Sequence, residues 1–157
     1  SQGRIVDFKN TIIIMTSNLG SDLILAADTN EKLQEIMPEI DDLLKRHFRP
    51  EFLNRLDETI MFKPLTKVDV TRIVDLLLED VNKRLVEREI SIELTDVAKN
   101  FVVDSGYEPM YGARPLKRYL QKHVETLAAR LILEGNVGRC DVIVIDVVDG
   151  ELKARIK

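Results

Sequence analysis

Three short segments of the sequence carry polar side chains of the kinds that bind or act on a phosphate group. They are residues 16–18, 48–58 and 112–118. An amide such as that of Asn18 hydrogen-bonds a phosphate oxygen or orients an attacking water molecule. An arginine guanidinium binds phosphate oxygens and offsets the charge that develops during phosphoryl transfer. The chemistry suggested by these segments is therefore recognition of a phosphate group.

Residues 16–18, Thr-Ser-Asn, follow an apolar run in the sequence. If that run is a strand, the three residues lie at its carboxyl end, where open α/β sheets bind their ligands. The alternative is an ordinary Asx-type turn. On spacing alone the turn is the more frequent case, because Ser and Asn are common turn residues.

Residues 48–58 interleave two arginines, Arg49 and Arg55, with apolar side chains. Packing of Phe52 and Leu53 would hold a guanidinium so that it points into the phosphate site of a neighbouring subunit. The alternative is a surface ion pair between Arg55 and a nearby acidic residue, which contributes about 0–1 kcal/mol. The residues alone leave both interpretations open.

Residues 112–118 place basic side chains at the start of a helix that is predicted to begin near Pro115. The helix dipole disfavours cations there by roughly 0.3–1 kcal/mol each, so helix stability does not explain them. A bound phosphate does, because it gains from free backbone amides and from Arg114 together. The alternative is a loop that is held by acidic neighbours.

The apolar run over residues 11–16 is continuous and β-branched, which is typical of a strand buried on both faces of a parallel sheet. Residues 30–48 are predicted to form two helices separated by a proline. A helical turn over 51–55 and a short strand over 59–62 follow, and we place a domain boundary near 63–66. Two strands do not complete a doubly covered parallel sheet, so the sequence is expected to be a piece of a larger protein.

Residues 66–106 are predicted to form a helix, a strand and a second helix. A capping-box pattern at 66–69 opens an amphipathic helix that continues to Leu85. Residues 91–94 alternate as a strand does. A second helix is predicted over 95–104, with Gly106 placed to end it.

The last third of the sequence predicts a long helix and a hairpin. Between Pro115 and Gly135, apolar residues recur every three or four positions, as on one face of a helix: Leu116, Leu120, Val124, Leu127 and Leu131. Residues 142–147 and 152–156 are strand-like, and Asp-Gly at 149–150 between them is a strong hairpin signal.

Composition narrows the classes of protein. With 157 residues, 45% of them hydrophobic and 32% charged, the chain is long enough for a core and is not of the disordered or collagen-like kind. A net charge of -4 argues against binding to a nucleic-acid backbone. One cysteine and two histidines are too few for a disulfide or a zinc cage, so no metal site is expected. With no apolar run near the roughly 20 residues that span a bilayer, we expect a cytoplasmic protein without membrane contact.

The motifs that hold a nucleoside triphosphate by themselves are missing. The sequence has no phosphate loop, no Gly-x-Gly-x-x-Gly pattern and no acidic strand end to hold magnesium. It also has no nucleophile elbow and no paired catalytic Cys and His. The chain by itself is therefore expected to bind no cofactor tightly and to be inactive as an enzyme.

Taken in order, the three polar segments resemble the C-terminal part of an AAA+ ATPase module. The resemblance is to the second nucleotide-binding module of Clp-type ring ATPases, most of all those of the ClpB disaggregase type. Residues 3–11 and 14–20 resemble the segment that ends in the family's sensor-1 strand, which makes Asn18 the sensor-1 residue. Residues 48–57 look like the arginine-finger segment, with Arg55 at the finger position, acting on the next subunit.

The third segment is similar to the family's sensor-2 motif, Gly-Ala-Arg, at 112–114. On that match Arg114, with Ala113 beside it, contacts the γ-phosphate of ATP bound in its own subunit. Ile73, in the helix that follows the predicted boundary, matches a position near the adenine. The resemblance thus implies catalytic roles for Asn18, Arg55 and Arg114, and nucleotide contacts for Arg114, Ala113 and Ile73.

The resemblance also implies a fold and a division of the chain. Residues 1–64 would be the C-terminal portion of an AAA+ large α/β subdomain. Residues 65–157 would be an α+β small subdomain, made of helices with a small antiparallel sheet. The fold class is then α/β followed by α+β.

The activity implied is that of an ATP-driven ring chaperone, a disaggregase that threads misfolded or aggregated protein through a homo-hexamer. ATP with Mg²⁺ would be the cofactor of the parent protein, and a co-chaperone would be a further partner. Neither nucleic acid nor membrane would be a partner.

Three alternatives remain. Clp subunits that serve the ClpP peptidase carry a docking loop with a glycine, and no glycine occurs between Gly20 and Phe48, so a ClpA- or ClpC-like unfoldase is less favoured. A non-catalytic module that packs rings or binds partners, with Arg114 structural, is the second alternative. An AAA+ DNA motor is the third, and the net charge of -4 argues against it.

Overall fold

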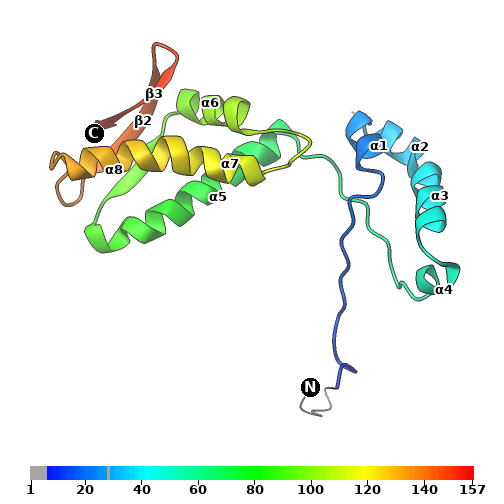
Figure 1. The fold of residues 1–157 in the computed structure, drawn as a ribbon. Helices are drawn as coiled ribbons and strands as arrows, with labels where there is room; N and C mark the ends of the chain where they lie inside the picture. Colours follow the sequence, from blue (N-terminus) through cyan, green and yellow to red (C-terminus); the bar gives the residue numbers. More distant parts are fainter. Residues whose placement is uncertain (1–6, 28) are drawn as a thin grey trace. The chain divides into compact units, whose positions relative to one another are not determined.

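The computed structural model describes residues 7–27 and 29–157 of the chain (Figure 1). The chain forms two compact units, Ser1–Lys63 (unit 1) and Pro64–Lys157 (unit 2). Residues 3–6, which contribute to the sensor-1 resemblance, lie outside the described residues.

Four short helices make up the described regular structure of unit 1. They are α1 (Ser21–Ala26), α2 (Asn30–Glu35), α3 (Met37–His47) and α4 (Pro50–Leu53). The two helices predicted over residues 30–48 are confirmed, with Pro38 in the first turn of α3, where its missing N–H costs nothing. Thr29 caps α2 by accepting a hydrogen bond of 3.3 Å from the backbone N–H of Lys32. The helix α1 was not predicted.

The two strands predicted in unit 1 are not formed. Residues 11–16 and 59–62 form no strand and pair with no strand among the described residues. The side chain of Ile13 is 85% exposed and that of Phe62 is 81% exposed. A strand is stable only when neighbouring strands take up its N–H and C=O groups, and the described part of unit 1 offers none. The prediction of a strand buried on both faces is therefore wrong for this chain.

Unit 2 opens with the long helix α5 (Lys67–Leu85), as predicted. The capping box is complete: the backbone N–H of Asp69 donates to the Thr66 hydroxyl at 3.2 Å, and the backbone N–H of Thr66 donates to the Asp69 carboxylate at 3.0 Å. The Thr66 hydroxyl also donates to this carboxylate, and these hydrogen bonds lower the pKa of Asp69. The start of α5 is thus fixed by its own sequence.

The remaining elements of unit 2 form helices over one small sheet. They are η1 (Val86–Arg88), β1 (Ser91–Leu94), α6 (Asp96–Gly106), α7 (Arg114–Tyr119), the π-helical turn η2 (Leu120–Glu125), α8 (Thr126–Leu133), β2 (Val142–Val148) and β3 (Glu151–Ile156). The strand order is β1-β2-β3. Helices α5, α6 and α8 pack against β1, β2 and β3 respectively.

The sheet is mixed, whereas an antiparallel sheet was expected. Strands β2 and β3 are antiparallel, and Asp149 (φ 55°) with Gly150 (φ 77°) makes the predicted tight hairpin turn. Strand β1, however, runs parallel to β2. Parallel neighbours need a long crossover, and the helices from α6 to α8 supply it.

Gly106 has a different role from the one predicted. It is the last residue of α6, but its φ is not positive, so it is not a left-handed cap. A Cβ added at Gly106 would lie 3.0 Å from the Cβ of Tyr119 in α7. The absence of a side chain therefore allows α6 and α7 to approach closely.

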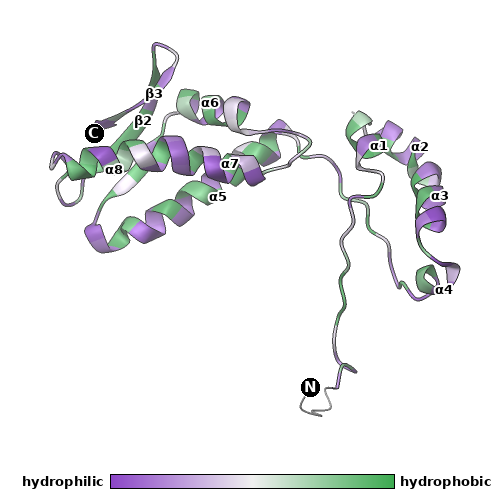
Figure 2. Ribbon diagram, viewed as in Figure 1, coloured by the Kyte–Doolittle hydropathy of each residue, from purple (hydrophilic) through white to green (hydrophobic). Residues whose placement is uncertain are grey.

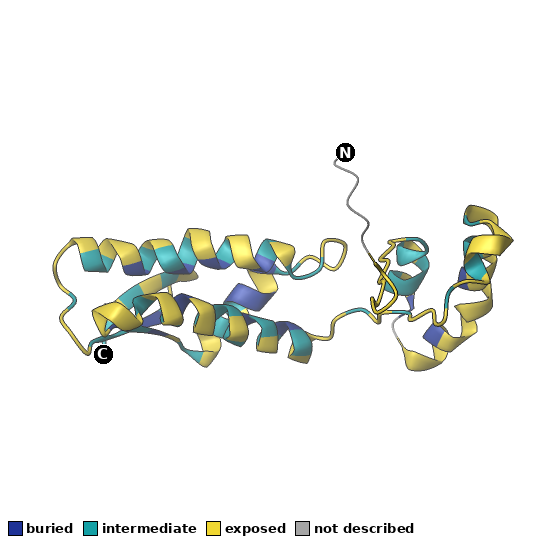
Figure 3. Cartoon of the chain, turned by 90° about the horizontal axis from the view of Figure 1, so that it is seen from below, coloured by how far each residue is buried: buried dark blue, intermediate teal, exposed yellow. Residues whose placement is uncertain are grey.

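The core of unit 2 lies between the helices and the sheet, where the apolar stripes of the helices meet (Figures 2 and 3). The predicted long helix is continuous from α7 to α8, but the π-helical turn shifts its stripe by one position. Leu120 and Val124 are buried as predicted, whereas after η2 the buried residue is Ala128 and the predicted Leu127 is only half-buried.

Asn82 closes the free edge of β1. Its side-chain NH₂ donates to the carbonyl of Ile92 at 3.0 Å, and its side-chain oxygen accepts from the N–H of Ile92 at 2.8 Å. Ile92 is only 2% exposed, so water does not replace these bonds easily. The amide therefore takes the place of a neighbouring strand at this position.

Replacing Asn82 with Ala is expected to lower the free energy of unfolding by about 1–3 kcal/mol, because two buried peptide groups of Ile92 lose their partners. Chemical denaturation of the chain followed by circular dichroism measures the loss. Asn100→Ala is the matched control, since Asn100 is exposed on α6. A loss for Asn82→Ala within about 0.5 kcal/mol of the control would contradict this role.

Candidate functional site

The loop between α6 and α7 presents two of the predicted site residues. Arg114 is the first residue of α7, and Ala113 precedes it as the N-cap residue. Gly112 has φ 64°, in the left-handed region that glycine tolerates best, and it turns the chain into the helix. Among the described residues, the exposed Arg114 side chain has neither a hydrogen bond nor an ion pair. Its guanidinium is available to an external anion, and no acidic neighbour holds it.

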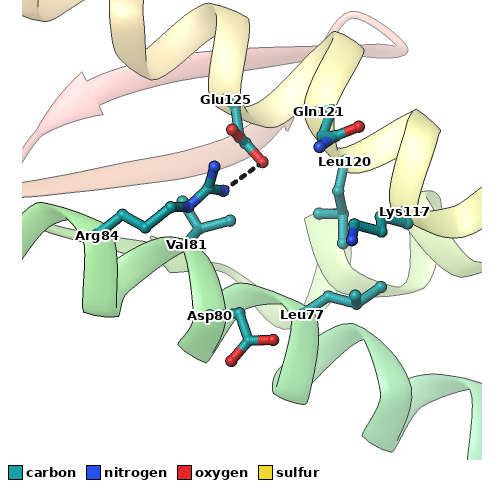
Figure 4. A pocket seen from close by; sticks show the side chains of 8 residues that line it. All are labelled: Leu77, Asp80, Val81, Arg84, Lys117, Leu120, Gln121 and Glu125. Atoms are coloured by element: carbon teal, nitrogen blue, oxygen red, sulfur yellow. Dashed lines mark hydrogen bonds and ion pairs between the residues drawn. The ribbon is translucent and has the colours of Figure 1, made fainter. Parts of the chain in front are cut away.

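Ile73 lies at the same end of unit 2 as this loop. Leu77 of α5 and Lys117 of α7 line one groove between the two helices (Figure 4). Ile73 is one helical turn before Leu77, and Arg114 is one turn before Lys117. An ion pair of 2.8 Å joins the later turns of α5 and η2, so the helices run in the same direction. Half-buried Ile73 and the pair Ala113 and Arg114 are therefore brought to one end of this helix pair.

The groove itself, of about 270 Å³, is lined by none of the five predicted residues. Its floor is apolar and its rim is charged, with the ion pair between Arg84 and Glu125 across one end (Figure 4). On the rim, a hydrogen bond from Lys83 lowers the pKa of Asp80, and the charges of Lys117 and Arg84 lower it further. The lining residues are Leu77, Asp80, Val81, Arg84, Lys117, Leu120, Gln121 and Glu125.

Asn18 lies in unit 1, at the end of the extended segment and before α1. Its carbonyl accepts a hydrogen bond of 3.1 Å from the N–H of Ser21. The side-chain hydrogen bond in this turn is made by Ser17, whose hydroxyl accepts a hydrogen bond of 3.1 Å from the N–H of Leu19. The Asn18 amide is exposed and has no partner within residues 7–27 and 29–157. The Asx-type turn is therefore not formed by Asn18.

Arg55 lies in the turn that follows α4, where its N–H donates to the carbonyl of Phe52 at 3.0 Å. The rings of Phe48 and Phe52 stack with their centroids 5.3 Å apart and stiffen this turn. The Arg55 side chain is exposed, and in the described part of the chain it makes no ion pair with Asp57 or Glu58. The alternative of a surface ion pair is therefore not formed in the structure.

The structure thus places Asn18 and Arg55 in unit 1 and the other three predicted residues in unit 2. No hydrogen bond or ion pair between described residues joins the Asn18 and Arg55 side chains. Among residues 7–27 and 29–157, no group of three or more His, Cys, Asp or Glu side chains is placed to hold a metal ion.

Sequence reasoning missed the contacts that hold this end of unit 2 together. Tyr107, at the start of the loop, donates a hydrogen bond of 3.4 Å from its hydroxyl to the carbonyl of Leu65. The two residues are 42 positions apart, and no local pattern reports such a contact. The one available signal was a tyrosine directly after a predicted helix end.

Comparison with known families follows the division into two units. The family model of the AAA domain (Cdc48 subfamily) matches residues 1–59. The family model of the C-terminal, D2-small domain of ClpB protein matches residues 65–145, which is more than half of the chain. The chain belongs to the ClpB D2-small family. The predicted resemblance to Clp-type AAA+ modules is confirmed, and the helices over a small sheet in unit 2 agree with an AAA+ α+β small subdomain.

Relatives named "Chaperone protein ClpB" are similar over nearly the whole chain. The ClpB of Bacillus cereus is 52% identical over 100% of this chain, and that of Nitratidesulfovibrio vulgaris is 50% identical over 100%. The ClpB of Aquifex aeolicus is 49% identical over 96% of the chain. The chain spans only 18%, 18% and 16% of the lengths of these relatives. In the described part of this ClpB family member, no helix has the length and apolarity that crossing a membrane requires.

Proposed function

We propose that this chain works as the C-terminal part of the second nucleotide-binding module of a ClpB-type ATP-driven ring chaperone. The observation that carries the proposal is membership of the ClpB D2-small family together with an unpaired arginine at the start of α7. Residues 1–64 act as the end of the large subdomain and residues 65–157 as the small subdomain. The longer protein hydrolyses ATP and uses the free energy to thread misfolded or aggregated protein through a homo-hexamer.

Each predicted site residue has a role in this proposal. Arg114, with Ala113 beside it, binds the γ-phosphate of ATP in its own subunit, and Ile73 packs near the adenine. Asn18 positions the attacking water molecule in the same subunit. Arg55 reaches the site of the next subunit, where its charge offsets that of the transferred phosphoryl group. The exposed, unpaired state of Asn18, Arg55 and Arg114 supports these roles, because no internal interaction must break first.

ATP with Mg²⁺ is the cofactor of the longer protein in this proposal, and the chain alone holds neither tightly. The protein works in the cytoplasm, with a co-chaperone as a further partner and without nucleic acid. The relatives named above are called ClpB chaperones, which favours this function over a ClpA- or ClpC-like protease subunit. Retention of ClpP by the longer protein in a pull-down would reverse that preference.

The test is the Arg114→Ala variant of the longer ATPase, assayed for ATP turnover and for ATP-dependent recovery of a heat-aggregated reporter enzyme. We expect both rates to fall by about 100- to 1,000-fold, because one preorganised donor to a charged phosphoryl group is lost. Arg118→Ala, an exposed arginine one turn later, is the matched control. Unchanged ATP turnover in Arg114→Ala would instead favour a module in which this arginine is structural.

A further inference from the structure

The loop ahead of Arg114 is held in a defined shape by its own backbone. The N–H of Tyr111 donates to the carbonyl of Glu108 at 3.0 Å, and Glu108 and Gly112 form an isolated antiparallel bridge. Gly112 then turns the chain directly into α7 at Arg114. The loop is therefore a folded turn, whose backbone contacts join residue 108 to residues 111 and 112, directly before Arg114.

Tyr107 anchors the other end of this loop. Its half-buried ring packs against the core of unit 2, and its hydroxyl donates to the carbonyl of Leu65 at 3.4 Å. Leu65 is the second residue of unit 2, directly after Pro64, and so belongs to the segment through which unit 2 is joined to unit 1. Figure 1 shows the loop between α6 and α7 beside the start of α5.

A second tie joins the same two places. Lys67, the first residue of α5, lies 2.8 Å from the carboxylate of Asp104, in the last turn of α6. Both side chains are more than 60% exposed, so this ion pair alone contributes only about 0–1 kcal/mol. Between Leu65 and Lys67, the capping box fixes the backbone of Thr66. The two ties thus link the segment 65–67 to the end of α6 and to the loop that follows it, and the capping box fixes the backbone of this segment at the start of α5.

We propose that Tyr107 is a positioning residue for Arg114. Together with the Lys67–Asp104 ion pair it forms a clasp, defined here as the contacts of Tyr107 and Asp104 with residues 65–67. The clasp ties the loop that carries Arg114 to the entry of unit 2, so engagement of an anion by Arg114 acts on the segment that leads to unit 1. This regulatory role rests on the proposed function of Arg114.

Another tyrosine of the same loop provides a matched control. Tyr111 is 64% exposed, and its hydroxyl has no partner among the described residues. Tyr107→Phe and Tyr111→Phe therefore make the same chemical change, loss of one phenolic oxygen, four residues apart. Both keep the aromatic ring, so both variants are expected to fold.

Hydrogen exchange of the whole chain, measured by mass spectrometry, tests the clasp without nucleotide. Tyr107→Phe is expected to speed exchange about five-fold in peptides that cover 65–70 and 108–114, as loss of one hydrogen bond predicts. Peptides of β2 should not change, and Tyr111→Phe should resemble the parent chain throughout. Unchanged exchange in the two segments would overturn the clasp, and so would an equal increase in β2, which reports general destabilisation.

The longer ATPase tests the coupling itself. Tyr107→Phe is expected to increase the ATP consumed per molecule of reporter enzyme recovered by about two-fold or more, because recovery falls more than ATP turnover does when the effect of turnover on unit 1 is weakened. Tyr111→Phe should leave this ratio at the parent value. An unchanged ratio in Tyr107→Phe would overturn the coupling. If Arg114→Ala left ATP turnover unchanged, the proposed function would fail, whereas the exchange result would still decide whether the clasp exists.

Discussion

Replacing Arg55 with Ala in the ring ATPase that contains this chain is expected to lower ATP turnover by about 10³- to 10⁵-fold. The proposed role of Arg55 is to offset charge on the phosphoryl group of a neighbouring subunit, and an arginine in that role is worth about 4–7 kcal/mol of barrier. Steady-state ATP hydrolysis by the assembled ring measures the effect. The folded chain should keep its stability, because the exposed Arg55 side chain has no partner among the described residues.

The control for this prediction is Arg49→Ala. Arg49 is an exposed arginine of the same segment, at the N-cap of α4, and its removal changes the net charge equally. We expect Arg49→Ala to keep ATP turnover within about three-fold of the parent, as loss of a surface charge predicts. Similar losses in the two variants would mean that the segment acts through its general charge or its folding. A normal rate in Arg55→Ala would rule out the finger role.

Replacing Leu116 with Ala is expected to lower the free energy of unfolding of unit 2 by about 2–5 kcal/mol, out of the 5–15 kcal/mol typical of a domain. Leu116 is fully buried in α7 and belongs to the core between the helices and the sheet. Truncation leaves a cavity that the surrounding side chains fill only in part. Denaturant unfolding of the chain, followed by far-ultraviolet circular dichroism, gives the value.

Leu133→Ala is the control, because Leu133 is 87% exposed at the end of α8. Its expected effect is within about 0.5 kcal/mol of the parent. Equal losses at Leu116 and Leu133 would contradict the packing described for α7. Since Arg114 lies two residues before Leu116, a weakened α7 should also reduce the effect of Arg114 in the longer ATPase.

The elements that could be predicted from sequence are those fixed by neighbouring residues. Thr66 and Thr95 cap the N-termini of helices, because each accepts a hydrogen bond from a backbone N–H three residues later. The Asp149-Gly150 turn likewise specifies its hairpin, since both residues adopt the positive φ that this turn needs. Such signals span four residues or fewer, and they are satisfied wherever the segment lies.

The failed predictions concern structure that depends on distant partners. The β-branched run at 11–16 has the composition of a buried strand, but composition supplies no neighbouring strand, so the run stays exposed. The parallel pairing of β1 with β2 joins residues 51 positions apart, and the sequence of neither strand indicates whether the two run parallel or antiparallel. At η2 the buried stripe steps by four residues, from Val124 to Ala128, whereas the larger apolar side chain three residues on, Leu127, had suggested a step of three.

The candidate site likewise combines residues that the sequence points to with contacts that it does not. Residue types and spacing drew attention to Asn18, Arg55 and Arg114, but left a turn, an ion pair and a held loop open as alternative explanations. In the described structure none of these side chains makes the local contact that its alternative required. The clasp at Tyr107 could not be predicted, because its partner Leu65 contributes a backbone carbonyl, which every residue has.

The central claim is that Asn18 acts within its own subunit whereas Arg55 acts on the next, and mixed rings test it most directly. Rings assembled from equal amounts of Asn18→Ala and Arg55→Ala subunits should regain ATP turnover that neither variant has alone. In about a quarter of the subunit contacts of a cyclic ring, an intact Asn18 would face an intact Arg55 from its neighbour. Mixtures of Asn18→Ala with Arg114→Ala, both proposed to act within one subunit, should regain little. Absence of recovery in the first mixture, or equal recovery in both, would contradict the account.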